Sequence, residues 1–260
     1  MLNKIKIDFF CNLLIQKKMF YHKSVGETTS EFANRVSQLH NGAKTCACGK
    51  LDPMARGITR VLVGDKTKEM EKHLNSNKTY EFYIVPGIST DSDDIMGLID
   101  NVSENISAQD IINIKTYMDN TISNLYTQKF HHYSALRLRK NGERHPLWYW
   151  YKKGLLDEEE IPEKKVNVYN LEFLKLQTIP KDYYLKNILD RLSKITHKDQ
   201  FRVKDITKKW SALNYNKSLL LLKFKIKVSS GFYVRMIAKQ IKKDLGVPVH
   251  IYDIHRTNVD

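Results

Sequence analysis

The spacing of apolar residues predicts helices at several places along the chain. In residues 28–39, apolar side chains recur at three- and four-residue steps behind Thr29 and Ser30, which are good helix-capping residues. The same spacing runs from 108 to 126 and begins after Ser107. Further helices are expected at 67–74, 184–192 and 232–245.

Alternating apolar and polar residues predict strands between these helices. The alternation is clearest in 80–85, which ends at Pro86 and Gly87, and in 219–228, where lysine occupies every second position toward the end. Residues 41–57 are rich in small residues and are expected to form a loop without regular structure. This irregular order of elements indicates an α+β protein rather than a doubly wound one. Further strands are expected at 58–63, 166–176 and, as a short strand, within 246–256.

The charge of the chain points to a polyanionic partner. Lys and Arg number 43 against 29 Asp and Glu, so the formal net charge is +14, and the positive charges are spread along the chain. Such a surplus attracts phosphate backbones without distinguishing RNA from DNA or from an anionic membrane. Because no apolar run approaches the ~20 residues needed to span a bilayer, nucleic acid is the favoured partner.

The cysteines and the N-terminal segment bear on compartment and metal binding. Cys11, Cys46 and Cys48 are odd in number and poorly spaced for disulfides, which favours a reducing environment. Residues 1–20 lack a long apolar region and a small-residue cleavage site, so no secretion signal is predicted and a cytoplasmic or other intracellular location is expected. No second Cys or His pair stands at zinc-ligand spacing, and no metal is predicted.

Two segments carry candidate chemistry. Residues 128–151 interleave aromatic and basic side chains, which suits stacking on single-stranded RNA but is also compatible with ordinary packing of an edge hairpin. The run from Gly49 to Gly57 places Asp52 between glycines, where a backbone can approach a ligand and a carboxylate can face a cleft. An Asp before a proline is also a common turn residue, so local chemistry alone leaves its role open.

That run resembles the Gly-x-Leu-Asp-Pro-x-Ala-x-Gly signature of TruB-type pseudouridine synthases, and similarity to other family motifs follows in the same order. The resemblance spans about 20–257, except for a polar, lysine-rich segment at about 178–216 that is interpreted as an insertion. It implies a pseudouridine synthase fold, with a mixed, mostly antiparallel central sheet flanked by helices and loops. The segments that carry the similarity are 23–29, 49–57, 63–68, 78–81, 87–97, Gln128, 133–136, 230–235 and 244–256.

The resemblance also implies an activity, namely the isomerisation of a uridine in structured RNA without a cofactor. The expected substrate is tRNA, with the T-loop uridine as one candidate. Asp52 would attack the sugar or assist glycal formation, Tyr80 would stack on the flipped base and take part in proton transfer, and Arg235 would hold Asp52 ionised. Without the family context these residues would be a turn residue, a core aromatic and a helix cation. The residues expected to bind substrate are Lys23, Leu51, Tyr233 and Ile254.

The chain departs from the family pattern at positions that contact RNA. Ala47 stands where the family usually has a histidine that fills the space left by the flipped base, which puts the usual T-loop target in doubt. Ser24 and Arg56 replace the usual Pro and Thr, and Phe130 and His131 replace a Pro-Pro pair. The basic insertion is a candidate RNA grip in place of the C-terminal PUA domain that is common in relatives.

These observations leave alternatives open. Residues 1–260 are expected to form one catalytic domain without the C-terminal PUA domain common in relatives, acting as a monomer with no obligate protein partner. A catalytically silent RNA chaperone would keep the same fold and basic surface. A guide-dependent subunit resembling dyskerin is disfavoured, because it needs partner surfaces and usually a PUA domain.

Overall fold

A computed structural model describes residues 19–260 of the chain. Residues 1–18, which include Cys11, lie outside the described residues. The prediction that residues 1–20 carry no secretion signal therefore concerns a segment of which only the last two residues are described. Among the helices of the described part, none is both long and apolar enough to cross a membrane.

A seven-stranded sheet runs through the molecule in the order β1-β3-β13-β4-β12-β11, with β2 paired to β3. Neighbouring strands are antiparallel except β3 and β13, which are parallel where Arg256 pairs with Gly57. The prediction of an α+β protein with a mixed, mostly antiparallel sheet is therefore confirmed. The strands are β1 (Phe20–Lys23), β2 (Thr45–Cys48), β3 (Arg56–Val63), β4 (Lys78–Pro86), β11 (Val168–Ile179), β12 (Leu219–Val228) and β13 (Val249–Val259).

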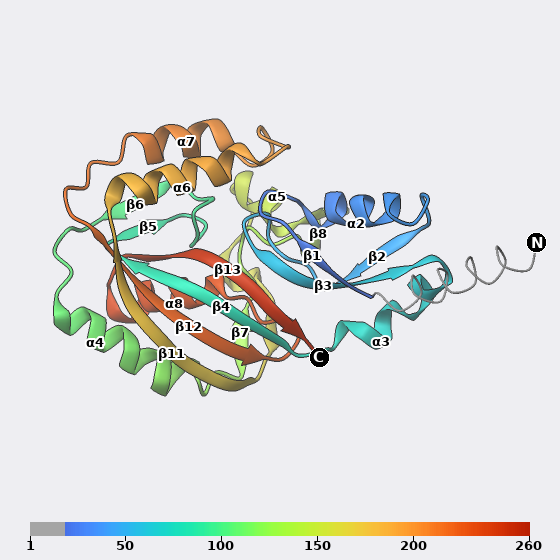
Figure 1. Ribbon diagram of the computed structural model, residues 1–260, viewed down its shortest axis with the longest axis horizontal. Helices are drawn as coiled ribbons and strands as arrows, with labels where there is room; N and C mark the ends of the chain where they lie inside the picture. Colours follow the sequence, from blue (N-terminus) through green and yellow to red (C-terminus); the bar gives the residue numbers. More distant parts are fainter. Residues whose placement is uncertain (1–18) are drawn as a thin grey trace, which may run out of the picture.

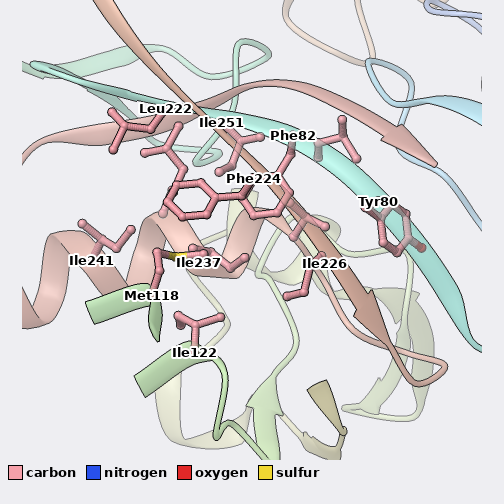
Figure 2. Packing of buried hydrophobic residues seen from close by; sticks show 14 of the residues in the cluster. Tyr80, Phe82, Met118, Ile122, Leu222, Phe224, Ile226, Ile237, Ile241 and Ile251 are labelled. Carbon is pink, nitrogen blue, oxygen red and sulfur yellow. The ribbon is translucent and has the colours of Figure 1, made fainter. Parts of the chain in front are cut away.

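One face of this sheet is covered by α8 (Arg235–Leu245) and α4 (Ala108–Tyr117), as Figure 1 shows. Alternate residues of β4 and β12 point toward these helices, and the rings of Phe82 and Phe224 stack with their centroids 5.9 Å apart. Ile237 and Ile241 of α8 complete the cluster, and Tyr80 lies at its edge (Figure 2). The strand pattern read from the sequence thus supplies the main core.

The opposite face is covered at one end by α6 (Lys181–Ser193) and α7 (Val203–Ser211) (Figure 1). These two helices lie within the segment interpreted as a polar insertion. Both are amphipathic, and their buried residues, among them Tyr184 and Trp210, pack against Val85 of β4 and Tyr252 of β13. The insertion is thus part of a second hydrophobic core.

Near the N-terminal end of the described chain, α2 (Thr29–Gln38) packs on β2 and β3 through Phe32 and Val36. Its N-cap is Thr28, which forms a capping box with Glu31, so the predicted cap at Thr29 or Ser30 is off by one or two residues. The expectation that 41–57 lacks regular structure is wrong, because β2 and the start of β3 lie within it.

Two other boundaries differ from the prediction. The helix predicted over 108–126 begins after Ser107 as expected, but α4 ends at Tyr117 and a π-helical turn, η2 (Met118–Ile122), follows. The closing strand is not short: β13 pairs with β4 along most of its length and with β3 at its end. Cross-strand partners on both sides extend it beyond what its own pattern indicates.

Shorter elements complete the described chain. The aromatic and basic segment at 128–151 contains the hairpin β8–β9 followed by α5, so the expected hairpin is present. The remaining elements are η1 (Gly64–Glu69), α3 (Met70–Leu74), β5 (Ile88–Thr90), β6 (Ile99–Val102), β7 (Thr127–Lys129), β8 (Arg137–Lys140), β9 (Glu143–Pro146), α5 (Leu147–Lys152), η3 (Glu158–Glu160) and β10 (Glu163–Lys165).

Candidate active site

Asp52 lies in the loop between β2 and β3, and buried cations beneath this loop hold its backbone. The Lys23 ammonium donates to the carbonyl oxygens of Pro53 at 3.3 Å and Ala55 at 2.8 Å. The sequence predicts Lys23 among the substrate-binding residues, but the structure buries it under the loop with 1% of its surface exposed. Burial lowers the pKa of Lys23 to about 8, against the opposing effect of the nearby Glu27 and Asp52 carboxylates.

A second support comes from Arg191 in α6. Its guanidinium donates to the carbonyl oxygens of Met54 at 3.0 Å and Tyr252 at 2.7 Å, and it forms an ion pair with Asp253 at 3.0 Å. Arg191 is buried, and sequence reasoning missed it because this segment was interpreted as a polar insertion and a candidate RNA grip. It ties the Asp52 loop to the insertion and to β13.

Arg235, the first residue of α8, forms an ion pair with Asp52. Its Nε lies 2.7 Å from Oδ2 of Asp52 and 3.6 Å from Oδ2 of Asp94, and its Nη1 donates to the Ser92 carbonyl oxygen at 3.3 Å. The Arg235 side chain is buried, whereas 34% of the Asp52 side chain is exposed. Burial lowers the pKa of Arg235, but the Asp52 and Asp94 carboxylates outweigh this effect and raise it overall, so the guanidinium stays charged.

The acidic loop that carries Asp94 is fixed from two sides. Asp93 is hydrogen-bonded to the buried His131 ring at 2.9 Å and paired with Lys242 of α8 at 2.6 Å. Asp91 receives two hydrogen bonds from Arg202, at 2.8 and 3.2 Å, on the insertion side. Burial raises the pKa of Asp94 to about 6 despite the neighbouring Arg235. The loop therefore places a second carboxyl group, that of Asp94, behind the Asp52–Arg235 pair.

A cleft of about 520 Å³ opens beside Asp52. Its walls include Leu51, Tyr80, Tyr233 and Ile254, so these predicted residues come together with Asp52 although they are far apart in the sequence. The four are largely apolar in contact area and mostly buried, which gives this part of the cleft an apolar wall next to a single carboxylate. Such a site suits a planar ring attached to a polar group.

The side-chain amide of Gln128 fixes the backbone of Tyr233 in this wall through two hydrogen bonds. The Gln128 side chain accepts from the Tyr233 backbone N–H at 2.7 Å and donates to the Tyr233 carbonyl oxygen at 3.1 Å. The ring of Phe130 packs edge-on against it at 5.4 Å. Burial raises the pKa of the Tyr233 hydroxyl, and the nearby Asp52 carboxylate acts in the same direction. The phenol therefore stays neutral near pH 7.

Four cations also line the cleft, and sequence reasoning singled out none of them: Lys50, Lys78, Lys164 and Arg256. Lys78 and Arg256 stand within segments that carry the family similarity, so a closer reading of those motifs could have found them; Lys164 has no such signal. Burial lowers the pKa of Lys78 to about 8, helped by Arg256 and Lys164. Lys78 and Arg256 are buried in the cleft wall, and mutual repulsion among neighbouring cations there favours an anionic ligand.

Gly57 allows Arg256 to reach this position. With φ of +126°, it lies against the Arg256 backbone so closely that a Cβ atom would stand 2.2 Å from the Arg256 carbonyl oxygen. Only glycine permits this approach of β3 to β13. The Arg256 guanidinium, which is buried, then donates to the Ile58 carbonyl oxygen and the Thr59 hydroxyl.

Within residues 19–260, no group of three or more His, Cys, Asp or Glu side chains is arranged to hold a metal ion. Cys46 and Cys48 are free thiols, and Cys46 contacts the thioether of Met70.

Comparison with known proteins places these features in context. Residues 37–187 match the family model described as TruB family pseudouridylate synthase (N terminal domain). The chain is similar to tRNA pseudouridine synthase B of Francisella philomiragia, with 26% identity over 236 residues, 91% of this chain and 62% of the relative. It is also similar to the enzyme of that name from Idiomarina loihiensis, with 28% identity over 67% of this chain and 56% of the relative. The chain thus spans about three fifths of the length of these relatives.

Solved structures with a similar arrangement include an H/ACA RNP bound to a substrate RNA containing 2′-deoxyuridine, with 14% identity and a TM-score of 0.46, covering 92% of this chain and 45% of that one. Another is a Cbf5-Nop10-Gar1 complex, with 15% identity and a TM-score of 0.47, covering 92% and 47%.

Proposed function

Because the chain belongs to the TruB family of pseudouridylate synthases, we propose that it isomerises a uridine in structured RNA to pseudouridine, with Asp52 as the nucleophile. The observation that carries this proposal is the ion pair of Asp52 with the buried Arg235, 2.7 Å apart, at the wall of a cleft lined by Tyr80 and Tyr233. A single carboxylate beside two tyrosine rings in this cleft fits chemistry at the sugar of a bound nucleotide.

In this mechanism the uridine leaves its helix and its base enters the cleft. An Asp52 oxygen bonds to C1′ of the ribose as the glycosidic N1–C1′ bond breaks, and the electron pair remains on uracil N1. The uracil turns within the cleft, C5 bonds to C1′, and the carboxylate is released. The proton lost from C5 balances the one gained at N1, so the product is an isomer and no oxidant or cofactor is consumed.

The surrounding residues have separate roles in this proposal. Arg235 keeps one Asp52 oxygen occupied, which aims the other at the sugar. Tyr80 offers a ring face to the base and a hydroxyl for proton transfer at the sugar, while Tyr233, Leu51 and Ile254 confine the turning uracil. Lys23 acts on the substrate only indirectly, since it positions the Asp52 loop from below.

The substrate proposal rests on charge and on the relatives. Lys50, Lys78, Lys164 and Arg256 surround the cleft, so the phosphates next to the target uridine would meet positive charge. The similar proteins are named tRNA pseudouridine synthases, and tRNA is therefore the proposed substrate.

The test is to incubate purified protein with uridine-labelled tRNA transcripts and analyse the nucleosides for pseudouridine. Wild-type protein should form it, Asp52→Asn should not, and Asp65→Asn should behave as wild type because the Asp65 side chain is 96% exposed. RNA binding without product from wild-type protein, on tRNA and then on total cellular RNA, would favour the alternative of an RNA-binding protein that lacks catalysis.

A further inference from the structure

A second, smaller pocket lies on the other side of Asp52. It has a volume of about 90 Å³, and Asp52 lines both this pocket and the larger cleft. Its walls combine three aromatic residues, Tyr133, Trp148 and Phe201, with the cations Lys152 and Arg202. Phe201 and Arg202 belong to the segment predicted to be an insertion, so this segment contributes one wall of the pocket and the rest comes from other parts of the chain.

Two contacts join the insertion to the rest of the pocket. The Lys152 ammonium donates to the Gln200 carbonyl oxygen at 2.9 Å and lies 5.3 Å from the centre of the Trp148 ring. The Arg202 guanidinium, paired with Asp91, lies 4.9 Å from the centre of the Tyr133 ring. These contacts hold aromatic rings around a preformed space.

The size and lining of this pocket fit a nucleobase. One buried water needs roughly 10–15 Å³ by the same measure, so about 90 Å³ has room for about six to nine water-sized groups, which is enough for a pyrimidine ring. Aromatic walls offer stacking faces that accept any base, and Lys152 and Arg202 add positive charge beside them. The acidic side chains at the pocket, Asp52 and Asp94, are both near Arg235, which limits repulsion of a phosphate.

We propose that this pocket binds the base of a nucleotide adjacent to the target uridine. The inference rests on the proposed function: with the target base in the large cleft and its ribose at Asp52, the chain of the RNA must continue past Asp52, and the second pocket is the space on that side. A neighbour captured there is unstacked together with the target.

This second base contact would compensate for Ala47, which stands where the family usually has a histidine that fills the space left by the flipped base. Ala47 lies in β2 opposite Val61 and packs against the small core beneath α2, so its side chain fills no gap in a bound RNA. Unstacking the target uridine costs free energy. Stacking of the neighbouring base on aromatic side chains of the protein offsets part of that cost. Residues of the predicted insertion would thereby stabilise the opened RNA by binding a neighbouring base, instead of by filling the space that the target base leaves.

A fluorescent base tests this arrangement directly. Two short single-stranded RNAs carry one uridine each, with 2-aminopurine on its 5′ side in one and on its 3′ side in the other. At low salt, where so basic a protein binds RNA, anisotropy of an end label reports binding and 2-aminopurine emission reports stacking. Wild-type and Asp52→Asn protein should quench one of the two probes. Trp148→Ala and Phe201→Ala should relieve the quenching and weaken binding about tenfold, while Tyr149→Ala, an aromatic neighbour outside the pocket, should not.

The outcomes separate this proposal from the proposed function. Pseudouridine formation with equal emission from bound probes in wild-type and Trp148→Ala protein would overturn the second base site alone. Quenching that depends on Trp148 and Phe201, in a protein that forms no pseudouridine, would keep the site and reject the catalytic role. Absence of binding of either probe at low salt, by a protein that forms pseudouridine in tRNA, would also overturn the second base site alone. Thermal unfolding of each variant checks that the fold is intact.

Discussion

The buried guanidinium of Arg235 bonds the partly exposed carboxylate of Asp52 across 183 residues of sequence, with Nε and Oδ2 2.7 Å apart. A second carboxylate, on Asp94, stands 3.6 Å from the same nitrogen. One cation thus serves two acidic groups, one facing the cleft and one enclosed by protein. Several consequences of this arrangement, and of the loops that support it, can be measured.

Removing Arg235 should destabilise the protein as well as abolish activity. Arg235→Met leaves Asp94 buried without its cation, and the loss of one partner from a buried pair costs about 3–5 kcal/mol of the free energy of unfolding. Arg235→Lys keeps the charge but lacks the planar, forked guanidinium, so the loss in the free energy of unfolding should be smaller than for Arg235→Met. Urea unfolding measures both; an Arg235→Met protein as stable as wild type would contradict the assignment.

The stability of the protein should depend on pH through Asp94. Its folded-state pKa of about 6 lies above the usual 3.8, so its contribution is full below pH 3.8 and is lost as the pH rises through about 6. This shift corresponds to on the order of 3 kcal/mol. Compared with Asp94→Asn, wild-type protein should therefore lose stability between pH 4 and 7. Unfolding curves that stay parallel over this range would rule the shift out.

Lys23→Met should slow catalysis without weakening RNA binding. The substitution removes the hydrogen bonds to Pro53 and Ala55 that shape the Asp52 loop, and small misplacements of a reacting group cost up to about 100-fold in rate. We expect kcat to fall by roughly 10- to 100-fold with little change in KM. Lys68→Met, at a side chain 80% exposed, is the matched control. An increase in KM alone would instead place Lys23 in contact with the substrate.

Binding of RNA should weaken at alkaline pH through Lys78. Because its pKa is lowered to about 8, this lysine is charged below that pH and neutral above it. Affinity measured at pH 7 and 9 should fall for wild-type protein, whereas Lys78→Gln should bind more weakly at pH 7 and lose the corresponding part of the pH dependence. The salt dependence of RNA binding by the Lys78→Gln protein should also be weaker, by the amount expected for the loss of about one phosphate contact. Lys44→Gln removes an exposed charge away from the cleft and should leave the pH dependence unchanged.

Arg191→Met in the insertion should impair both stability and activity. The substitution removes one of the two ion pairs of Asp253 and leaves the pair with Arg56. It also removes the hydrogen bonds that Arg191 donates to the carbonyl oxygens of Met54 and Tyr252. A loss of about 3–5 kcal/mol is expected from the broken buried pair. Lys186→Met, on the exposed face of the same helix, should change little. Equal effects of the two substitutions would mean that the insertion does not support the site.

The sequence by itself determined the main strands, the principal helices and most of the site. Alternation in β4 and β12 and helical spacing in α2 and α8 are local patterns, and they survive in the fold because each buries its apolar face. The resemblance to the family also named Asp52, Tyr80, Tyr233, Arg235, Leu51 and Ile254, and the structure gathers these residues around one cleft and its ion pair.

The tertiary structure alone decided what lies beneath and beside that cleft. Lys23 and Arg191 would ordinarily be surface residues, and only their burial against backbone carbonyl oxygens makes them supports of the Asp52 loop. The length of β13 depends on strands on both of its sides, and the inward packing of the insertion depends on a face of the sheet distant in sequence. Such pairings between remote segments leave no periodic trace in the chain, so a local pattern could not reveal them.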